Sequence, residues 1–153
     1  MDDKYFLQLA EINDFELWMN FVTLVRHEFR PLKQDEEFEK YKQTVVKNIN
    51  RKTAICVKCE DIVIGILIFS INQNCLGCMA VHPEHRKNGI ASAMITKMLS
   101  ILSPNKNVWV TTYREDNVKG VAPRALYKKF GFIEDELTMD FGYPHQKFVL
   151  HRC

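Results

Sequence analysis

The fold of this chain is decided by the stretch Leu76–Leu102, which reads LGCMAVHPEHRKNGIASAMITKMLSIL. It predicts an apolar strand, a basic turn that closes on Gly89, and then an amphipathic helix. The first N–H groups of a helix lack intrahelical partners and lie at its positive end, so this turn is a candidate anion site, with phosphate as the usual ligand. The alternative is a tight strand-to-helix connection with a solvated basic tip.

Two other phosphate motifs are excluded. The sequence contains no G-x-x-x-x-G-K-[ST] motif and therefore no nucleoside triphosphate P-loop of that kind. It also contains no G-x-G-x-x-G motif, which argues against a Rossmann dinucleotide site.

Length and composition favour one soluble globular domain. The chain has 153 residues, of which 46% are hydrophobic and 26% charged, as in ordinary globular proteins. The net charge of +2 is too small to indicate nucleic acid or an anionic membrane as a partner. No secretory signal is visible, and no apolar stretch is long enough to span a bilayer. The five cysteines do not suggest a disulfide framework, so we expect a cytoplasmic protein.

Apolar periodicity and turn residues predict a mixed order of elements. The expected strands are Phe6–Leu9, Thr53–Cys59, Ile62–Ile71, Cys75–Val81, Val108–Tyr113, Ile133–Met139 and Gln146–His151. The first expected helix has a capping box at Asn13 and Glu16, an apolar stripe of Leu17, Phe21, Leu24, Val25 and Phe29, and a stop at Pro31. The second begins at Asp35 and has an apolar stripe of Phe38, Tyr41, Val45 and Ile49. The third is Ile90–Leu102, and the fourth runs from about Pro123 to a left-handed cap at Gly131. The three consecutive strands from Thr53 to Val81 are expected to form an antiparallel meander.

The turn and its surroundings resemble a known superfamily. Arg86, Gly89 and Ala91 fill the fixed positions of the acyl-CoA motif [Q/R]-x-x-G-x-[G/A] of the GNAT acyltransferases. The segment ALYKKFGF, Ala125–Phe132, resembles the later helix of that family, with its tyrosine and terminal Gly-Phe. The order of elements fits along nearly the whole chain.

The resemblance implies a fold and a domain extent. It implies an α/β (α+β) fold of three layers, with a central mixed, mostly antiparallel sheet of about 6–7 strands flanked by about 4 helices. Residues 1–153 would form a single GNAT-like N-acetyltransferase domain. Dimers are common in the family, so a homodimer stays open.

The resemblance also implies how acetyl-CoA, the co-substrate, is held. The strand Cys75–Val81 would splay from Val108–Tyr113, and pantetheine would hydrogen-bond to the backbone of Met79, Ala80 and Val81. The pyrophosphate would rest on backbone N–H groups of the turn, whose residues are Arg86, Lys87, Asn88, Gly89, Ile90, Ala91 and Ser92.

Tyr127 is the catalytic residue that the resemblance implies. A phenol, with an ordinary pKa of about 10, can protonate the departing CoA thiolate or hydrogen-bond to it, as a general acid. The alternative is a helix tyrosine that only packs on the sheet. The attacking amine must lose a proton, and Glu28, Glu115 and His82 are candidate bases.

The sequence departs from the family at one position and leaves the acceptor open. The family often has an asparagine seven residues before the tyrosine, where this chain has Gly120, and Asn117 lies three residues earlier. Acceptor specificity would be shaped by Glu28–Leu32 and Phe141–His145, and the acceptor pocket would be lined by Phe29, Tyr143 and His145, unless these side chains are simply core or surface fillers. The acceptor would be an amine, on a small molecule or a protein.

Two alternatives belong to other functional classes. One is a non-catalytic CoA-binding regulatory module. The other is a zinc module, because Cys56-x2-Cys59 and Cys75-x2-Cys78 match a four-cysteine pattern. Cys56 and Cys59 are predicted at a strand end, where residues i and i+3 face opposite sides, so we expect no metal site.

Overall fold

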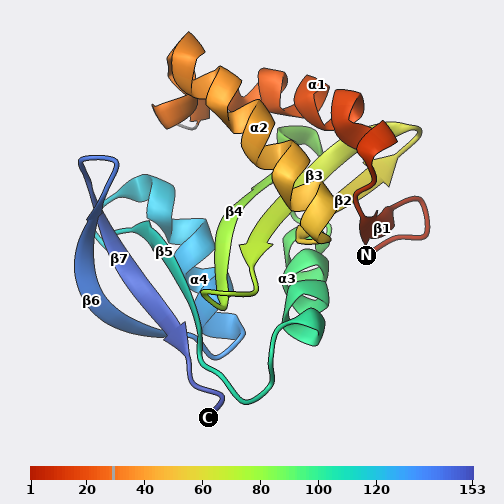
Figure 1. The fold of residues 1–153 in the computed structure, drawn as a ribbon. Helices are drawn as coiled ribbons and strands as arrows, with labels where there is room; N and C mark the ends of the chain where they lie inside the picture. The colour runs from red at the N-terminus through yellow and green to blue at the C-terminus, as the bar shows by residue number, and fades with distance from the viewer. Residues whose placement is uncertain (29) are drawn as a thin grey trace.

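The computed structural model describes residues 1–28 and 30–153, and it has the expected order of elements (Figure 1). The strands are β1 (Phe6–Leu9), β2 (Ala54–Cys59), β3 (Ile62–Ser70), β4 (Cys75–Val81), β5 (Val108–Tyr113), β6 (Ile133–Asp140) and β7 (Tyr143–Leu150). The α-helices are α1 (Phe15–Val25), α2 (Asp35–Arg51), α3 (Ile90–Ile101) and α4 (Val121–Lys129). Short 3-10 turns at Ile12–Asp14, Arg26–Glu28, Arg30–Lys33, Pro83–His85 and Val118–Gly120 connect them.

The seven strands form one sheet in the order β1-β2-β3-β4-β5-β7-β6. Neighbouring strands run antiparallel except β4 and β5, which are parallel. The meander of β2, β3 and β4 is confirmed, and Glu60 and Asp61 make its first turn with φ of 50° and 66°. A two-residue hairpin with both central residues in the left-handed region matches the natural twist of the strands.

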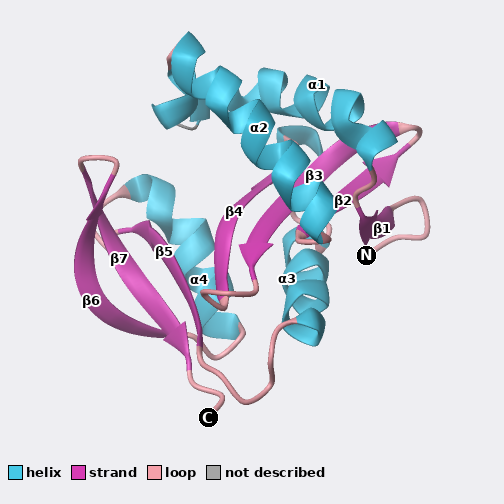
Figure 2. Cartoon of the chain, viewed as in Figure 1, coloured by secondary structure: helices cyan, strands magenta, loops and turns pink. Residues whose placement is uncertain are grey.

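Helices cover both faces of the sheet and form the two outer layers of the three-layer fold (Figure 2). On one face, α1 and α2 bury a core that includes Trp18, Val22 and Val45. On the other face, α3 and α4 bury a second core, in which Met94 and Tyr127 lie. Because β3 is covered on both sides, it reads in sequence as a nearly continuous apolar run. The predicted fold class is thus confirmed.

The start of α1 differs from the prediction. Asn13 and Glu16 do not form a capping box, because a 3-10 turn ends at Asp14 just before the helix. The Glu11 N–H donates to the Asp14 carboxylate at 2.8 Å, and this buried carboxylate also pairs with Lys58 of β2. The capping box is therefore formed by Glu11 and Asp14, two residues earlier than predicted, and Asp14 is fixed by a partner on the sheet.

The end of α1 also differs. The helix ends at Val25, well before Pro31, because Arg26 Nε donates to the Leu32 carbonyl at 2.8 Å and turns the chain into 3-10 geometry. Leu24, predicted in the apolar stripe, is 54% exposed, and Phe29 lies outside the described residues.

Two smaller shifts occur in the C-terminal half. α4 begins at Val121 rather than near Pro123, because the 3-10 turn Val118–Gly120 leads directly into it. β7 begins at Tyr143 rather than Gln146, because Phe141 and Gly142, with φ of 53° and 79°, make a tight hairpin with β6. Gly131 has a φ of 95° and ends α4 as predicted.

Candidate active site

The site is built where β4 and β5 separate. Their ladder pairing in the described residues is limited to Cys75 with Trp109, and beyond it the strands diverge, as the resemblance implied (Figure 1). We call this opening the splay. β4 has a β-bulge at Gly77, an extra residue at which its register with β3 shifts. Beyond that bulge, Met79, Ala80 and Val81 are only half-buried, although β4 is a central strand.

The candidate phosphate turn lies at the open end of the splay. β4 and β5 are parallel, so their carboxyl ends, Val81 and Tyr113, are at the same end of the sheet. The chain then passes from β4 to α3, whose N-cap Gly89 has a φ of 77°. Ligands of α/β sheets commonly bind outside the carboxyl ends of such strands.

The geometry of the turn leaves backbone donors available. The first α3 bond runs from the Ala93 N–H to the Gly89 carbonyl at 3.0 Å, so the N–H groups of Ile90, Ala91 and Ser92 precede the helical ladder. Asn88 Nδ2 donates to two carbonyls of the turn and braces it. The side chain of Ile90 is in the core, so Ile90 offers a ligand only its backbone.

The side chain of Arg86 is hydrogen-bonded to two other segments of the chain. Its Nε donates to the Val81 carbonyl at 3.2 Å. Its Nη2 reaches both carboxylate oxygens of Glu28, at 3.0 and 3.2 Å. Lys87 is also exposed and has a φ of 65°.

Tyr127 lies on α4 and is 5% exposed. Its ring packs against Phe132 and Phe148, with centroid separations of 5.8 and 6.1 Å. Burial raises the pKa of the Tyr127 phenol far above its ordinary value, and the nearby Cys78 thiol of β4 raises this pKa further. The phenol is therefore neutral at physiological pH and close to the strand that borders the splay.

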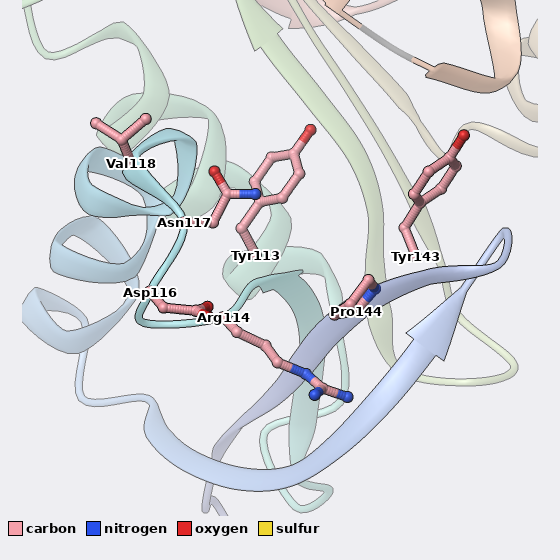
Figure 3. Close-up of a pocket in the computed structure, with 7 residues that line it drawn as sticks. All are labelled: Tyr113, Arg114, Asp116, Asn117, Val118, Tyr143 and Pro144. Atoms are coloured by element: carbon pink, nitrogen blue, oxygen red, sulfur yellow. The ribbon is translucent and has the colours of Figure 1, made fainter.

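A cavity of about 510 Å³ lies at the same end of the sheet, between the β5–α4 loop and the start of β7 (Figure 3). Figure 3 shows Asn117 and Tyr113 across from Tyr143 and Pro144, with the two phenol groups extending in the same direction. His145 does not line the cavity but stacks on Tyr113, with a centroid separation of 5.4 Å. The other lining residues are Arg114, Asp116 and Val118.

Sequence reasoning placed Tyr143 near an acceptor and singled out Asn117, but it did not select Tyr113, Arg114 or Pro144 as lining residues. Tyr113 and Arg114 carry a usable signal, because they close a predicted strand next to the splay. Pro144 carries none, since its position depends on how the hairpin folds back against β5.

The glycine at position 120 has a packing reason. A Cβ there would lie 3.0 Å from Tyr113 Cβ and 3.2 Å from the Tyr113 carbonyl oxygen. An asparagine would therefore require the α4 start to move away from β5. Asn117 is the N-cap of the preceding 3-10 turn, with its Oδ1 accepting from the Lys119 N–H at 2.9 Å, and it also lines the cavity.

The three candidate bases have different surroundings. Glu28 is paired with Arg86, as described above. His82 follows β4 directly, and its Nδ1 accepts from the Glu84 N–H at 3.1 Å, which leaves Nε2 as the position for a proton on the neutral ring. Glu115 is exposed at the start of the β5–α4 loop.

The cysteines are distributed over both cores. Cys56 lies in the core under α1 and α2, and Cys59 lies in the core on the opposite face. Burial raises the pKa of Cys56 to about 12 and that of Cys78 to about 11. Within residues 1–28 and 30–153, no group of three or more His, Cys, Asp or Glu side chains is arranged to hold a metal ion.

Arg124 of α4 connects the elements that surround the cavity. It is 6% exposed and donates to the Tyr113 carbonyl at 3.1 Å, to Gln146 Oε1 at 2.8 Å and to Glu134 Oε1 at 2.8 Å. The guanidinium thus ties the α4 helix to β5, β6 and β7.

We expect Arg124→Met to lower the free energy of unfolding by about 3 kcal/mol, because the Tyr113 carbonyl and the buried Gln146 side-chain oxygen would lose a charged donor. Urea denaturation of the purified protein measures this loss. Lys128→Met is the matched control, since Lys128 binds the same Glu134 oxygen from the surface, with 55% of its side chain exposed. Equal losses in the two variants would contradict the role given to Arg124.

Comparison with known proteins identifies the family. The model of the acetyltransferase (GNAT) domain matches residues 50–134, more than half of the chain. No curated protein matches. The helices in the described part of the chain include none with the length and apolar character needed to cross a membrane.

Solved structures share the fold at low sequence identity. A GNAT-family acetyltransferase from Bacillus cereus ATCC 10987 is 20% identical, with a TM-score of 0.72 over 97% of this chain and 98% of that one. Ard1 from Thermoplasma volcanium is 13% identical, with a TM-score of 0.74 over 96% and 97% of the two chains. A spermidine N-acetyltransferase chimera from Vibrio cholerae and hSSAT is 18% identical, with a TM-score of 0.65 over 98% and 96%. The matched domain model, together with the shared fold, shows that this chain belongs to the GNAT family of acetyltransferases.

Proposed function

We propose that this protein transfers an acetyl group from acetyl-CoA to an amine by direct attack. The observation that carries the proposal is the coincidence of three features at one end of the sheet: the splay, the Gly89 turn at the start of α3, and the buried phenol of Tyr127 on α4. Residues 1–153 would act as a single domain.

The backbone holds the cofactor in this proposal. The N–H groups from Arg86 to Ser92 bind the pyrophosphate, because they lack helical partners and lie at the positive end of α3. Lys87 adds a positive charge. Pantetheine pairs with the exposed edge of β4 at Met79, Ala80 and Val81, where β5 no longer supplies a partner.

Tyr127 is the general acid. The amine nitrogen bonds to the acetyl carbon while the carbon–sulfur bond breaks, and N–H groups near Val81 polarise the carbonyl. The sulfur accepts a hydrogen bond from the Tyr127 hydroxyl and takes its proton, which the proton released by the amine replaces through water. A phenol with a raised pKa keeps its proton at neutral pH, so its hydroxyl can donate a hydrogen bond to the departing sulfur.

An amine acceptor is supported by the chemistry of the cavity. Two phenols, the Asn117 amide and the Asp116 carboxylate can surround a polar or cationic group. The spermidine N-acetyltransferase chimera, which shares the fold, is named for an amine acceptor. The acceptor here would be a small-molecule amine or a protein amine.

One observation favours a second function, a CoA-binding regulatory module without turnover. Glu28 is engaged by Arg86, and His82 Nδ1 already accepts a backbone hydrogen bond, so two of the three candidate bases have partners. Such a module would bind acetyl-CoA at the same turn but would not transfer its acetyl group, so no free CoA thiol would form.

An amine panel separates the two functions. The protein is incubated with acetyl-CoA and polyamines, amino sugars, amino acids and peptides with free N-termini, and free thiol is measured over time. We expect thiol release that depends on particular amines. Tight CoA binding by calorimetry with no amine-dependent release across the panel would favour the regulatory module.

A further inference from the structure

The guanidinium of Arg86 joins three segments that are distant in sequence. It lies on the phosphate turn, and its Nε is bound to the carbonyl of Val81 at the end of β4. Its Nη2 is bound to both oxygens of Glu28, which is 58 positions away in the connection between α1 and α2. Nη1 has no partner among the residues that the structure describes, so one edge of the guanidinium stays available.

The connection that carries Glu28 is braced on its own side. Arg26 Nε binds the Leu32 carbonyl at 2.8 Å, its Nη2 binds Asp35 at 3.2 Å, and its guanidinium lies 4.0 Å from the centroid of the Phe38 ring. These contacts hold the chain against the start of α2. Among the described residues, the Arg86–Glu28 ion pair links this connection to the phosphate turn.

The pair also connects the two faces of the sheet. The phosphate turn starts α3, which covers one face, whereas Glu28 belongs to the connection of α1 and α2, which cover the other face. If CoA occupies the α3 side of the splay, the α1–α2 side is left as an approach for an amine that attacks the thioester directly, because both reactants must be present at once. Glu28 and its neighbours would then border the path of the amine.

We propose that Arg86 is a positioning residue that couples CoA binding to the order of the α1–α2 connection through Glu28. This inference rests on the proposed function. Phosphate at the turn fixes the turn backbone and adds negative charge beside the guanidinium, so Arg86 is held more firmly and holds Glu28 in turn. The consequence is that CoA prepares the acceptor side before the amine arrives.

Hydrogen exchange with CoA as the only ligand tests the coupling. The readout is the exchange of backbone amides in residues 22–28, with and without CoA at a concentration that calorimetry shows to be saturating for each variant. In the wild-type protein we expect CoA to slow this exchange by at least about threefold. In Glu28→Gln and Arg86→Gln the CoA effect should disappear, and the double variant should show no further change.

Glu84→Gln is the matched control. It removes the same charge from an exposed position two residues before Arg86, where the side chain makes no ion pair within the described chain. In this control, CoA should still slow the exchange of residues 22–28. If Glu28 had a purely structural role, Glu28→Gln would change the exchange equally with and without CoA.

The outcomes distinguish this inference from the proposed function. Failure of the wild-type protein to bind CoA would overturn both. CoA binding that slows exchange equally in Glu28→Gln and Glu84→Gln would overturn the coupling alone, and acetyl transfer could still occur.

Discussion

Gly89→Val should lower the affinity for CoA by at least about 100-fold, or about 3 kcal/mol, while the protein remains folded. Gly89 has a φ of 77°, a conformation that costs a residue with a side chain about 1–2 kcal/mol, and more for a β-branched one. A Cβ here would meet little of the protein, since its nearest described neighbour is the Met1 nitrogen at 3.7 Å. The valine side chain would instead fill the space in front of the α3 N–H groups, where we place the pyrophosphate.

Gly142→Val separates backbone strain from blocking of the site. Gly142 has almost the same φ, 79°, and a Cβ there has no described atom within 4 Å. Both variants should lose similar thermal stability, measured by calorimetric unfolding, but only Gly89→Val should lose CoA binding, measured by isothermal titration. Unchanged CoA affinity in Gly89→Val would remove the phosphate from this turn.

Much of the fold could be predicted because its signals are local. β4 and β5 have the predicted boundaries, since each is a short apolar run between polar turns. Ile90, Met94 and Met98 of α3 and its C-cap Leu102 are buried, as a predicted amphipathic helix requires. A helical period of apolar residues depends on the chain itself and is seldom changed by tertiary contacts when it is this regular.

The errors occurred where a distant partner decides the structure. The capping box was predicted at Asn13 and Glu16 because nothing near Asp14 in sequence shows that Lys58 of β2 is its partner. The end of α1 depends on a bond from Arg26 to a carbonyl beyond a short turn, and Pro31 was the more visible stop signal. A pattern of residues predicts capping chemistry well, but it does not say which of several capable side chains is used.

The candidate site likewise has features set by neighbouring residues, which were predicted, and features set by distant partners, which were not. Gly89 was identified from a motif because the backbone conformation of a turn depends on a few adjacent residues. The direction of the Arg86 side chain could not be predicted, because it is set by Glu28 on a segment that packs on the opposite face of the sheet. The cavity beside Tyr113 likewise requires the β6–β7 hairpin to fold against β5 before it exists.

Tyr127→Phe should lower kcat by about 100-fold while the Kd for CoA stays within about twofold, because loss of a general acid typically costs 100-fold or more and the phenyl ring is retained. The ring contacts with Phe132 and Phe148 do not involve the hydroxyl, so the packing of α4 should survive. Steady-state rates with an amine found in the panel, together with calorimetric titration of CoA, measure the two effects. Tyr41→Phe is the control, since it removes the same atom from a half-buried tyrosine on α2, the other side of the sheet, where the hydroxyl accepts from Trp18 Nε1, and it should leave kcat within about threefold.

The pH dependence gives a second test of the same residue. Burial and the Cys78 thiol raise the pKa of Tyr127 above its ordinary value, so the hydroxyl keeps its proton up to and beyond pH of about 10. A catalytic acid with its ordinary pKa would instead lose activity as the pH approaches that value. We therefore expect the kcat of the wild-type protein to show no decline caused by ionisation of Tyr127 between pH 7 and about 10. Any decline that is seen in this range should also be present in Tyr127→Phe. If kcat is unchanged in Tyr127→Phe, the phenol is a packing residue, and the sulfur must leave without help from α4.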